Sequence, residues 1–102
     1  MGRLFDESEP AAAQQVAALD EVSLRERARD ALQNGRLPRR RPDRALGGPG
    51  SGEPCFLCGV VLRRDGVELE AVFTQPTADA IRYHLHPRCL AAWELEIPAQ
   101  TA

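Results

Sequence analysis

The sequence predicts an α+β fold in which N-terminal helices precede a short sheet and a last helix. Three observations lead to this prediction. Apolar residues recur with helical spacing between residues 11 and 34, which is typical of an amphipathic helix. Apolar and polar residues alternate between residues 67 and 85, as in strands that are buried on one face. A second helical run follows Pro87, a residue that suits the first turn of a helix.

Length and composition limit the chain to one small folded unit. At 102 residues, with 43% apolar and 27% charged residues and a net charge of −2, it has the composition of a soluble protein. A unit of this size often needs a metal or a disulfide for stability. No run approaches the roughly 18 consecutive apolar residues of a membrane helix. Residues 1–10 carry acids where a signal peptide has its apolar centre, so we expect a cytoplasmic protein.

The N-terminal segment is predicted to contain two helices, or one helix with a kink. One apolar stripe runs over residues 12–19, and a second stripe, in a different phase, runs over residues 24–32. The change of phase falls near Ser23, which forms a capping box with Glu26 and so predicts a helix start. Gly35 predicts the end, because glycine accepts the left-handed conformation that follows many helices.

Residues 35–54 are predicted to be a linker. Between residues 36 and 54 there are four prolines and four glycines, and these residue types interrupt regular structure. The linker also contains a cluster of arginines, called here the arginine group. Its members are Arg36, Arg39, Arg40, Arg41 and Arg44.

A β-hairpin is predicted after the linker. Residues 60–62 and 67–73 have strand-like composition, and the Asp-Gly pair at 65–66 between them is a strong hairpin signal. Residues 74–80 are predicted to be a loop.

A third strand and a helix complete the predicted fold. Residues 81–85 alternate in hydropathy, which places His84 and His86 on the face opposite to the apolar side chains. The helix is predicted to run from Pro87 until Pro98 stops it. Six residues are expected to form a small core, in which Trp93 is packed rather than free to stack on a base. They are Leu69, Phe73, Tyr83, Leu90, Trp93 and Ile97.

Every cysteine and histidine lies in two short stretches, CFLCG and HLHPRC. Three cysteines in a chain without an export signal favour metal or redox use of the thiols over disulfides. Gaps of two residues separate Cys55 from Cys58 and His86 from Cys89, so each pair can reach one ion. Three thiolates and one imidazole form a closed set that is typical of one structural zinc ion.

His84 is the alternative to His86 as the fourth ligand, because its spacing to Cys89 is also permitted at zinc sites. Alternate residues of a strand lie roughly 7 Å apart, so both histidines are not expected to bind one ion with three cysteines. We prefer His86, since it forms the second pair with a two-residue gap and adjoins the helix start.

Other uses of the cysteines are less favoured. A thioredoxin-like redox pair belongs to a βαβ unit, and no such unit is visible. Iron–sulfur clusters rarely use histidine. A catalytic zinc keeps an open position, and the His-x-Glu partner of the zinc deaminases is missing. We therefore predict neither catalysis nor a small-molecule substrate.

The order of knuckle, hairpin, strand and helix resembles that of treble-clef zinc fingers. The apolar-His-x-x-Cys run is similar to the end of a metal half-site in LIM and PHD modules, which use further ligands for a second zinc. The wider pattern of RLPRRRPDR, GGPG, PCxxCG and YHxHxRCxAAWE resembles a set of small bacterial zinc-finger proteins. These resemblances imply a single-zinc finger and no particular activity.

The predicted organisation has four parts. They are a helical segment at 1–34, whose first ten residues are candidates for disorder, the linker at 35–54, a zinc-finger domain at 55–97 and a tail at 98–102.

Three functions are compatible with this organisation. In the first, the protein is an accessory module that binds a protein partner or a second copy through the stripes at 12–19 and 24–32. In the second, the arginine group binds DNA or RNA phosphates, with salt-dependent affinity. The arginines are equally expected to pair with acids of the finger, namely Glu68, Glu70, Glu94 and Glu96. In the third, oxidation of the thiols releases the metal, so that the protein responds to redox or metal status.

Overall fold

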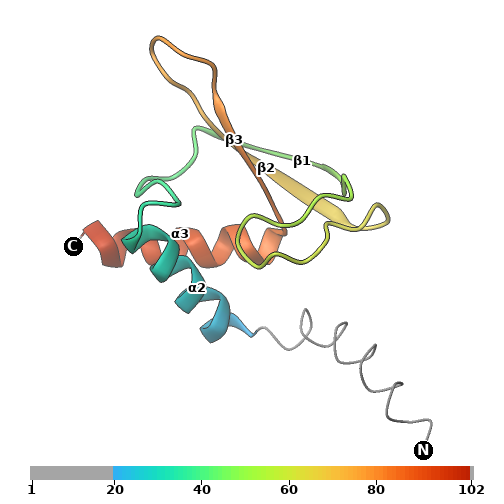
Figure 1. Cartoon of the computed structure of the whole chain (residues 1–102), viewed down its shortest axis with the longest axis horizontal. Helices are drawn as coiled ribbons and strands as arrows, with labels where there is room; N and C mark the ends of the chain where they lie inside the picture. The colour runs from blue at the N-terminus through green and yellow to red at the C-terminus, as the bar shows by residue number, and fades with distance from the viewer. Residues whose placement is uncertain (1–19, 102) are drawn as a thin grey trace, which may run out of the picture.

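The computed structural model describes residues 20–101, with side chains described for residues 20–97. The elements are α2 (Glu21–Gln33), β1 (Arg44–Pro49), β2 (Val67–Phe73), β3 (Ile81–Leu85) and α3 (Pro87–Thr101). The strands form an antiparallel sheet in the order β1-β2-β3, and both helices lie on one side of it (Figure 1). The chain is therefore α+β, as predicted. The predicted stripe at 12–19 lies outside the described residues.

Helix α2 begins earlier than the capping box predicts. Asp20 is the N-cap, and its side-chain oxygen accepts a hydrogen bond from the backbone N–H of Ser23 at 2.9 Å. The predicted start at Ser23 is wrong because a carboxylate three residues upstream already caps the helix and faces its positive end. The predicted end is confirmed. Gly35 has a φ of 82°, and the next N–H donates to the carbonyl of Ala31 at 2.8 Å.

The apolar stripe of α2 packs against α3. Its residues are at most 3% exposed, so the stripe at 24–32 is used inside the chain and is not the docking face that we predicted. An ion pair reinforces this contact. Glu96 of α3 is 1% exposed and accepts from Arg25 at 2.6 Å and from Arg29 at 3.1 Å. Burial raises the pKa of Glu96, but these two arginines outweigh it and hold the pKa below its usual value.

The segment that we predicted to be a linker contains the edge strand β1. Its backbone pairs with β2, with Ala45 opposite Ala71 and Gly47 opposite Leu69. The sequence RALGGP gives no strand signal, because glycine and proline are unfavourable in strands and most of β1 is exposed. The open edge of β2 supplies the hydrogen-bonding partners instead. Pro49, which lacks an N–H, lies at the end of this edge strand, where such a residue is tolerated.

The predicted hairpin between 60–62 and 67–73 does not form. Val61 makes an isolated bridge with Pro54, and the loop at 50–54 is the true partner of this segment. Gly52 donates to the carbonyl of Leu62 at 2.8 Å, and Leu62 donates to Glu53 at 2.7 Å. The Asp-Gly turn does form, but it connects residues 60–62, which pair with the loop at 50–54, to β2. An Asp-Gly pair fixes where the chain turns, whereas the partner of each strand is decided by distant residues.

The third strand and the last helix are close to the prediction. β3 occupies the predicted residues 81–85 and pairs with β2, and the 74–80 loop projects away from the helices (Figure 1). Helix α3 continues past Pro98 to Thr101, so the predicted stop is wrong. A proline inside a helix costs a hydrogen bond and crowds the preceding turn, but it does not always end the helix. No described helix is long and apolar enough to cross a membrane.

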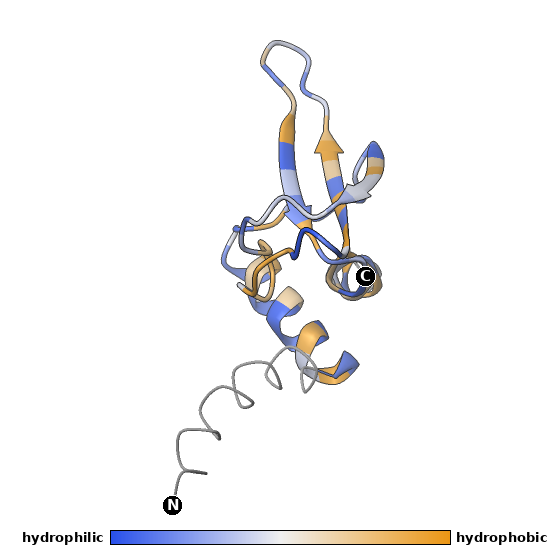
Figure 2. Cartoon of the chain, turned by 90° about the vertical axis from the view of Figure 1, so that its right-hand side faces the viewer, coloured by the Kyte–Doolittle hydropathy of each residue, from blue (hydrophilic) through white to orange (hydrophobic). Residues whose placement is uncertain are grey.

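The core lies between the sheet and α3, with Trp93 at its centre. Trp93 is 0% exposed, stacks on Phe73 at 5.5 Å between ring centroids, and meets the edge of Tyr83 at 5.7 Å. Its indole N–H donates to the carbonyl of Pro38 at 3.1 Å. The core interpretation of Trp93 is thus confirmed. Hydrophobic and hydrophilic residues alternate along the strands beside this core (Figure 2).

Candidate metal centre

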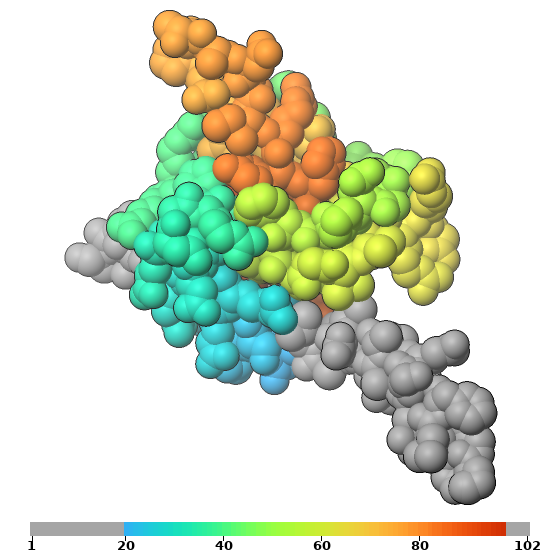
Figure 3. Space-filling view, viewed as in Figure 1, coloured from blue at the N-terminus to red at the C-terminus, as the bar shows by residue number. Residues whose placement is uncertain are grey.

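The first half of the candidate site is a tight turn after the linker. Cys55 donates its N–H to Val60 at 2.8 Å, and Gly59, with a φ of 79°, donates to Cys55 at 2.9 Å. Only glycine adopts such a conformation without strain, so the turn can carry both cysteines on its inner side. The N–H of Phe56 binds the carbonyl of His84 at 2.9 Å, which attaches the turn to β3. Figure 3 shows this segment in yellow-green beside the orange β3 region.

The second half lies where β3 gives way to α3. The carbonyl of His86 accepts from the backbone N–H groups of Cys89 and Leu90 at 3.0 and 3.1 Å, so His86 closes the first turn of α3. Pro87 occupies the next position, where its missing N–H has no cost. The strand end and the helix start therefore present His86 and Cys89 toward the same point.

Together the two halves bring the four predicted residues into one cluster. The ligand atoms of Cys55, Cys58, His86 and Cys89 all lie within 4.8 Å of one another. The Nδ1 atom of His86 is 3.4 Å from the sulfur of Cys58 and 3.8 Å from the sulfur of Cys89. A tetrahedral zinc ion with ordinary bond lengths would place sulfur and nitrogen ligands about 3.6 Å apart. The donor set and its spacing therefore fit such an ion.

The contacts between the three thiols shift their pKa values in different directions. Hydrogen bonds from Cys58 and Cys89 lower the pKa of Cys55 far below its usual value. The same contact with Cys55 raises the pKa of both other thiols, and their burial raises it further. A divalent cation at this point would allow all three sulfurs to ionise.

Apolar residues surround two members of the cluster. Cys55 and Cys89 are each 2% exposed and belong to the same buried group as Leu62, Leu85 and Leu90. Cys58 and His86 are half-buried, so the cluster lies at the edge of this buried group.

His84, the alternative ligand, lies on the other face of the sheet and is not part of the cluster. Its Nδ1 contacts Glu68, and its Nε2 lies 3.7 Å from Glu70. Glu68 is 6% exposed, and its other oxygen accepts the N–H of Ser51 at 2.8 Å. Burial raises the pKa of Glu68, but the bonds from His84 and Ser51 outweigh it and lower the pKa. This group of three side chains was not predicted from the sequence, although strand alternation places them on one face of the sheet.

Several members of the arginine group contact the rest of the chain. The guanidinium of Arg36 lies over the ring of Phe56 at 5.5 Å. Arg40 lies over Phe73 at 5.0 Å and pairs with Asp43 at 3.2 Å. These contacts fix the segment between α2 and β1.

The remaining members differ in their contacts. Arg39 donates to the carbonyl of Leu32 at 3.4 Å. Within the described residues, the side chains of Arg41 and Arg44 are exposed and form no hydrogen bond or ion pair. Nucleic-acid binding by the arginine group stays a prediction.

The pairing that we predicted between the arginine group and the acids of the finger does not occur for three of those acids. Glu96 pairs with Arg25 and Arg29 of α2, whereas Glu68 and Glu70 face His84. These acids contact residues that helix packing and strand register bring close to them. Neither helix packing nor strand register can be read from the local sequence.

Comparison of the chain with protein-family models, with curated proteins and with solved structures finds no match.

Proposed function

We propose that this protein is a small zinc-binding module, in which one structural zinc ion is held by Cys55, Cys58, His86 and Cys89. The observation that carries the proposal is the convergence of these four ligand atoms within 4.8 Å. Two of them come from a glycine-containing turn and two from a strand end and a helix start. That order of parts supports a treble-clef-like finger.

Ligand chemistry favours zinc over other ions. Thiolates are soft ligands, and a set of three thiolates and one imidazole suits zinc better than magnesium, calcium or manganese. The set supports a structural role rather than a catalytic one, because four protein ligands fill a tetrahedral ion and leave no position for water. The burial of Cys55 and Cys89 supports the same conclusion.

The two histidines provide the direct test of the ligand set. Native mass spectrometry of purified protein, dialysed to remove loosely held metal, is expected to show one zinc ion in the wild type and in His84→Ala. His86→Ala is expected to lose the ion or to retain it only in part, because the imidazole is one of four ligands. With cobalt in place of zinc, sulfur-to-metal charge-transfer absorption should appear in wild type and His84→Ala.

The opposite pattern, with zinc lost in His84→Ala and kept in His86→Ala, would show that the ligand set is wrong. A folded wild type without metal would contradict the whole proposal. A redox role would then be the better interpretation of the cysteines.

The module is proposed to act by binding protein, and specifically by pairing with a second copy. Two observations support this. A hollow of about 340 Å³ lies between the start of α2 and α3, and Leu95 beside it is 47% exposed. The apolar stripe predicted at residues 12–19 needs an apolar partner, and the stripe at 24–32 is already buried in the chain. The hollow is lined by Glu21, Leu24, Arg88, Ala91, Ala92 and Leu95.

Substitution of the exposed leucine tests this pairing. Leu95→Glu is expected to abolish a concentration-dependent rise in mass that sedimentation equilibrium detects in the zinc-loaded wild type. Val16→Glu, in the other proposed partner surface, should have the same effect, because each dimer needs both surfaces. Leu46→Glu is the matched control, since Leu46 is 42% exposed but lies on β1. A wild type that stays monomeric at all concentrations would contradict the pairing.

A further inference from the structure

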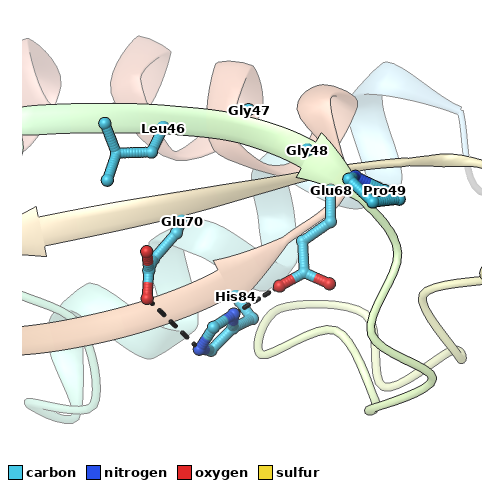
Figure 4. A pocket seen from close by; sticks show the side chains of 7 residues that line it. All are labelled: Leu46, Gly47, Gly48, Pro49, Glu68, Glu70 and His84. Atoms are coloured by element: carbon cyan, nitrogen blue, oxygen red, sulfur yellow. Dashed lines mark hydrogen bonds and ion pairs between the residues drawn. The ribbon is translucent and has the colours of Figure 1, made fainter.

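We propose that His84 and Glu70 form a second, exchangeable metal site on the outer face of the sheet, which binds a first-row divalent transition ion such as zinc. Figure 4 shows His84 between Glu68 and Glu70, beneath the backbone of Gly47 and Gly48. This site shares no ligand with the buried cluster, and its existence does not depend on the function proposed above.

Glu68 prepares the imidazole for this role. One carboxylate oxygen is held by the N–H of Ser51, and the other contacts Nδ1 of His84. A carboxylate only accepts, so Nδ1 must carry the hydrogen, and a neutral ring then has its lone pair on Nε2. Histidines that bind metals usually donate their other N–H to a carboxylate or a carbonyl in this way, which fixes the ring orientation.

Glu70 supplies the second ligand atom. Its Oε2 lies 3.7 Å from Nε2 of His84, which is too long for a hydrogen bond between them. Zinc–nitrogen and zinc–oxygen bonds together span about 4.1 Å, so one ion can contact both atoms with a bent geometry. The other oxygen of Glu70 is paired with Arg82 at 3.3 Å, which leaves Oε2 for the ion.

The surroundings leave room for the ion and its water. A hollow of about 140 Å³ adjoins the two side chains, and Gly47 and Gly48 place no side chain in it. The side chain of His84 is 42% exposed, so water can fill the remaining coordination positions and the ion can exchange. The guanidinium of Arg82 opposes a cation here, and the site is therefore weaker than the buried cluster.

Calorimetric titration of zinc into protein that already holds one zinc ion tests the proposal. The wild type is expected to bind one further equivalent, and His84→Ala is expected to bind none while it keeps the first ion. Glu68→Gln should weaken the second event by about tenfold, the lower end of the usual effect of such supporting carboxylates. Arg82→Ala should strengthen it by removing the opposing charge.

Glu94→Gln, which changes a carboxylate on α3, serves as the control and should leave the second event unchanged. Mass spectrometry of the first zinc and far-ultraviolet circular dichroism show whether each variant is folded. The absence of a second equivalent in the wild type, or its persistence in His84→Ala, would overturn the proposal. If these side chains only form ion pairs and bind no metal, no second zinc equivalent will bind to the wild type or to any variant.

Discussion

Removal of the proposed zinc ion is expected to unfold residues 20–97 cooperatively. The core of a domain of this size rarely supplies more than about 3–5 kcal/mol of stability. Structural zinc contributes about 10–16 kcal/mol of apparent binding free energy to zinc-finger peptides at neutral pH. Small zinc-finger domains are generally unfolded without their metal, and we expect the same of this chain. The metal would no longer connect the turn at Cys55 to the end of β3 and the start of α3.

A high-affinity chelator at neutral pH provides the measurement. The helical signal in far-ultraviolet circular dichroism should fall, and the fluorescence of the single tryptophan should shift to longer wavelength as Trp93 meets water. Both signals should recover when zinc is restored under reducing conditions. A metal-free protein that kept its helical signal and a cooperative thermal transition would contradict this expectation.

A serine substitution separates loss of metal from other effects of the chelator. Cys89→Ser is expected to be unfolded even with excess zinc, because it removes a buried thiolate from the first turn of α3. The matched control is Val61→Ser, since Val61 is 50% exposed and lies near the cluster outside the ligand set. It should bind zinc and fold like the wild type.

Sequence patterns predicted the parts of this protein that depend on local chemistry. The two-residue gaps indicated the cysteine and histidine pairs, and the structure brings all four side chains together. Alternating hydropathy placed β3 at its observed residues 81–85. In both cases the signal lies within a few residues of the feature, and a physical rule connects the two.

The parts that sequence reasoning missed depend on distant contacts. β1 has neither apolar alternation nor strand propensity, and it exists because β2 offers an open edge. Glu96 is buried only because Arg25 and Arg29 arrive from another helix. The preference for His86 as a ligand came from local spacing, but the contact of His84 with Glu68 on the neighbouring strand was not predicted. Local patterns carry no information on such pairings.

Replacement of Trp93 by alanine is expected to lower the stability of the zinc-loaded protein by about 3–5 kcal/mol, the usual cost of removing a buried aromatic side chain. Trp93 is fully buried, stacks on Phe73 and binds the carbonyl of Pro38. Trp93→Phe keeps most of the packing but leaves that carbonyl unpaired, so a smaller loss of about 1–3 kcal/mol is expected. Urea unfolding followed by circular dichroism measures both, because the variants have no tryptophan fluorescence. A loss below about 1 kcal/mol in Trp93→Ala would contradict the packing described here.

The same substitution also tests whether folding and zinc binding are one process. Trp93 lies one helical turn after Cys89, on the same side of α3, but it contributes no ligand atom. If the metal-free chain is unfolded, the free energy of zinc binding includes that of folding, and Trp93→Ala must weaken zinc affinity. A loss of about 3–5 kcal/mol corresponds to a roughly 10²–10⁴-fold weaker affinity in a chelator competition. An unchanged affinity together with the loss of stability would mean that the metal-free protein is already folded, which would refute the first expectation.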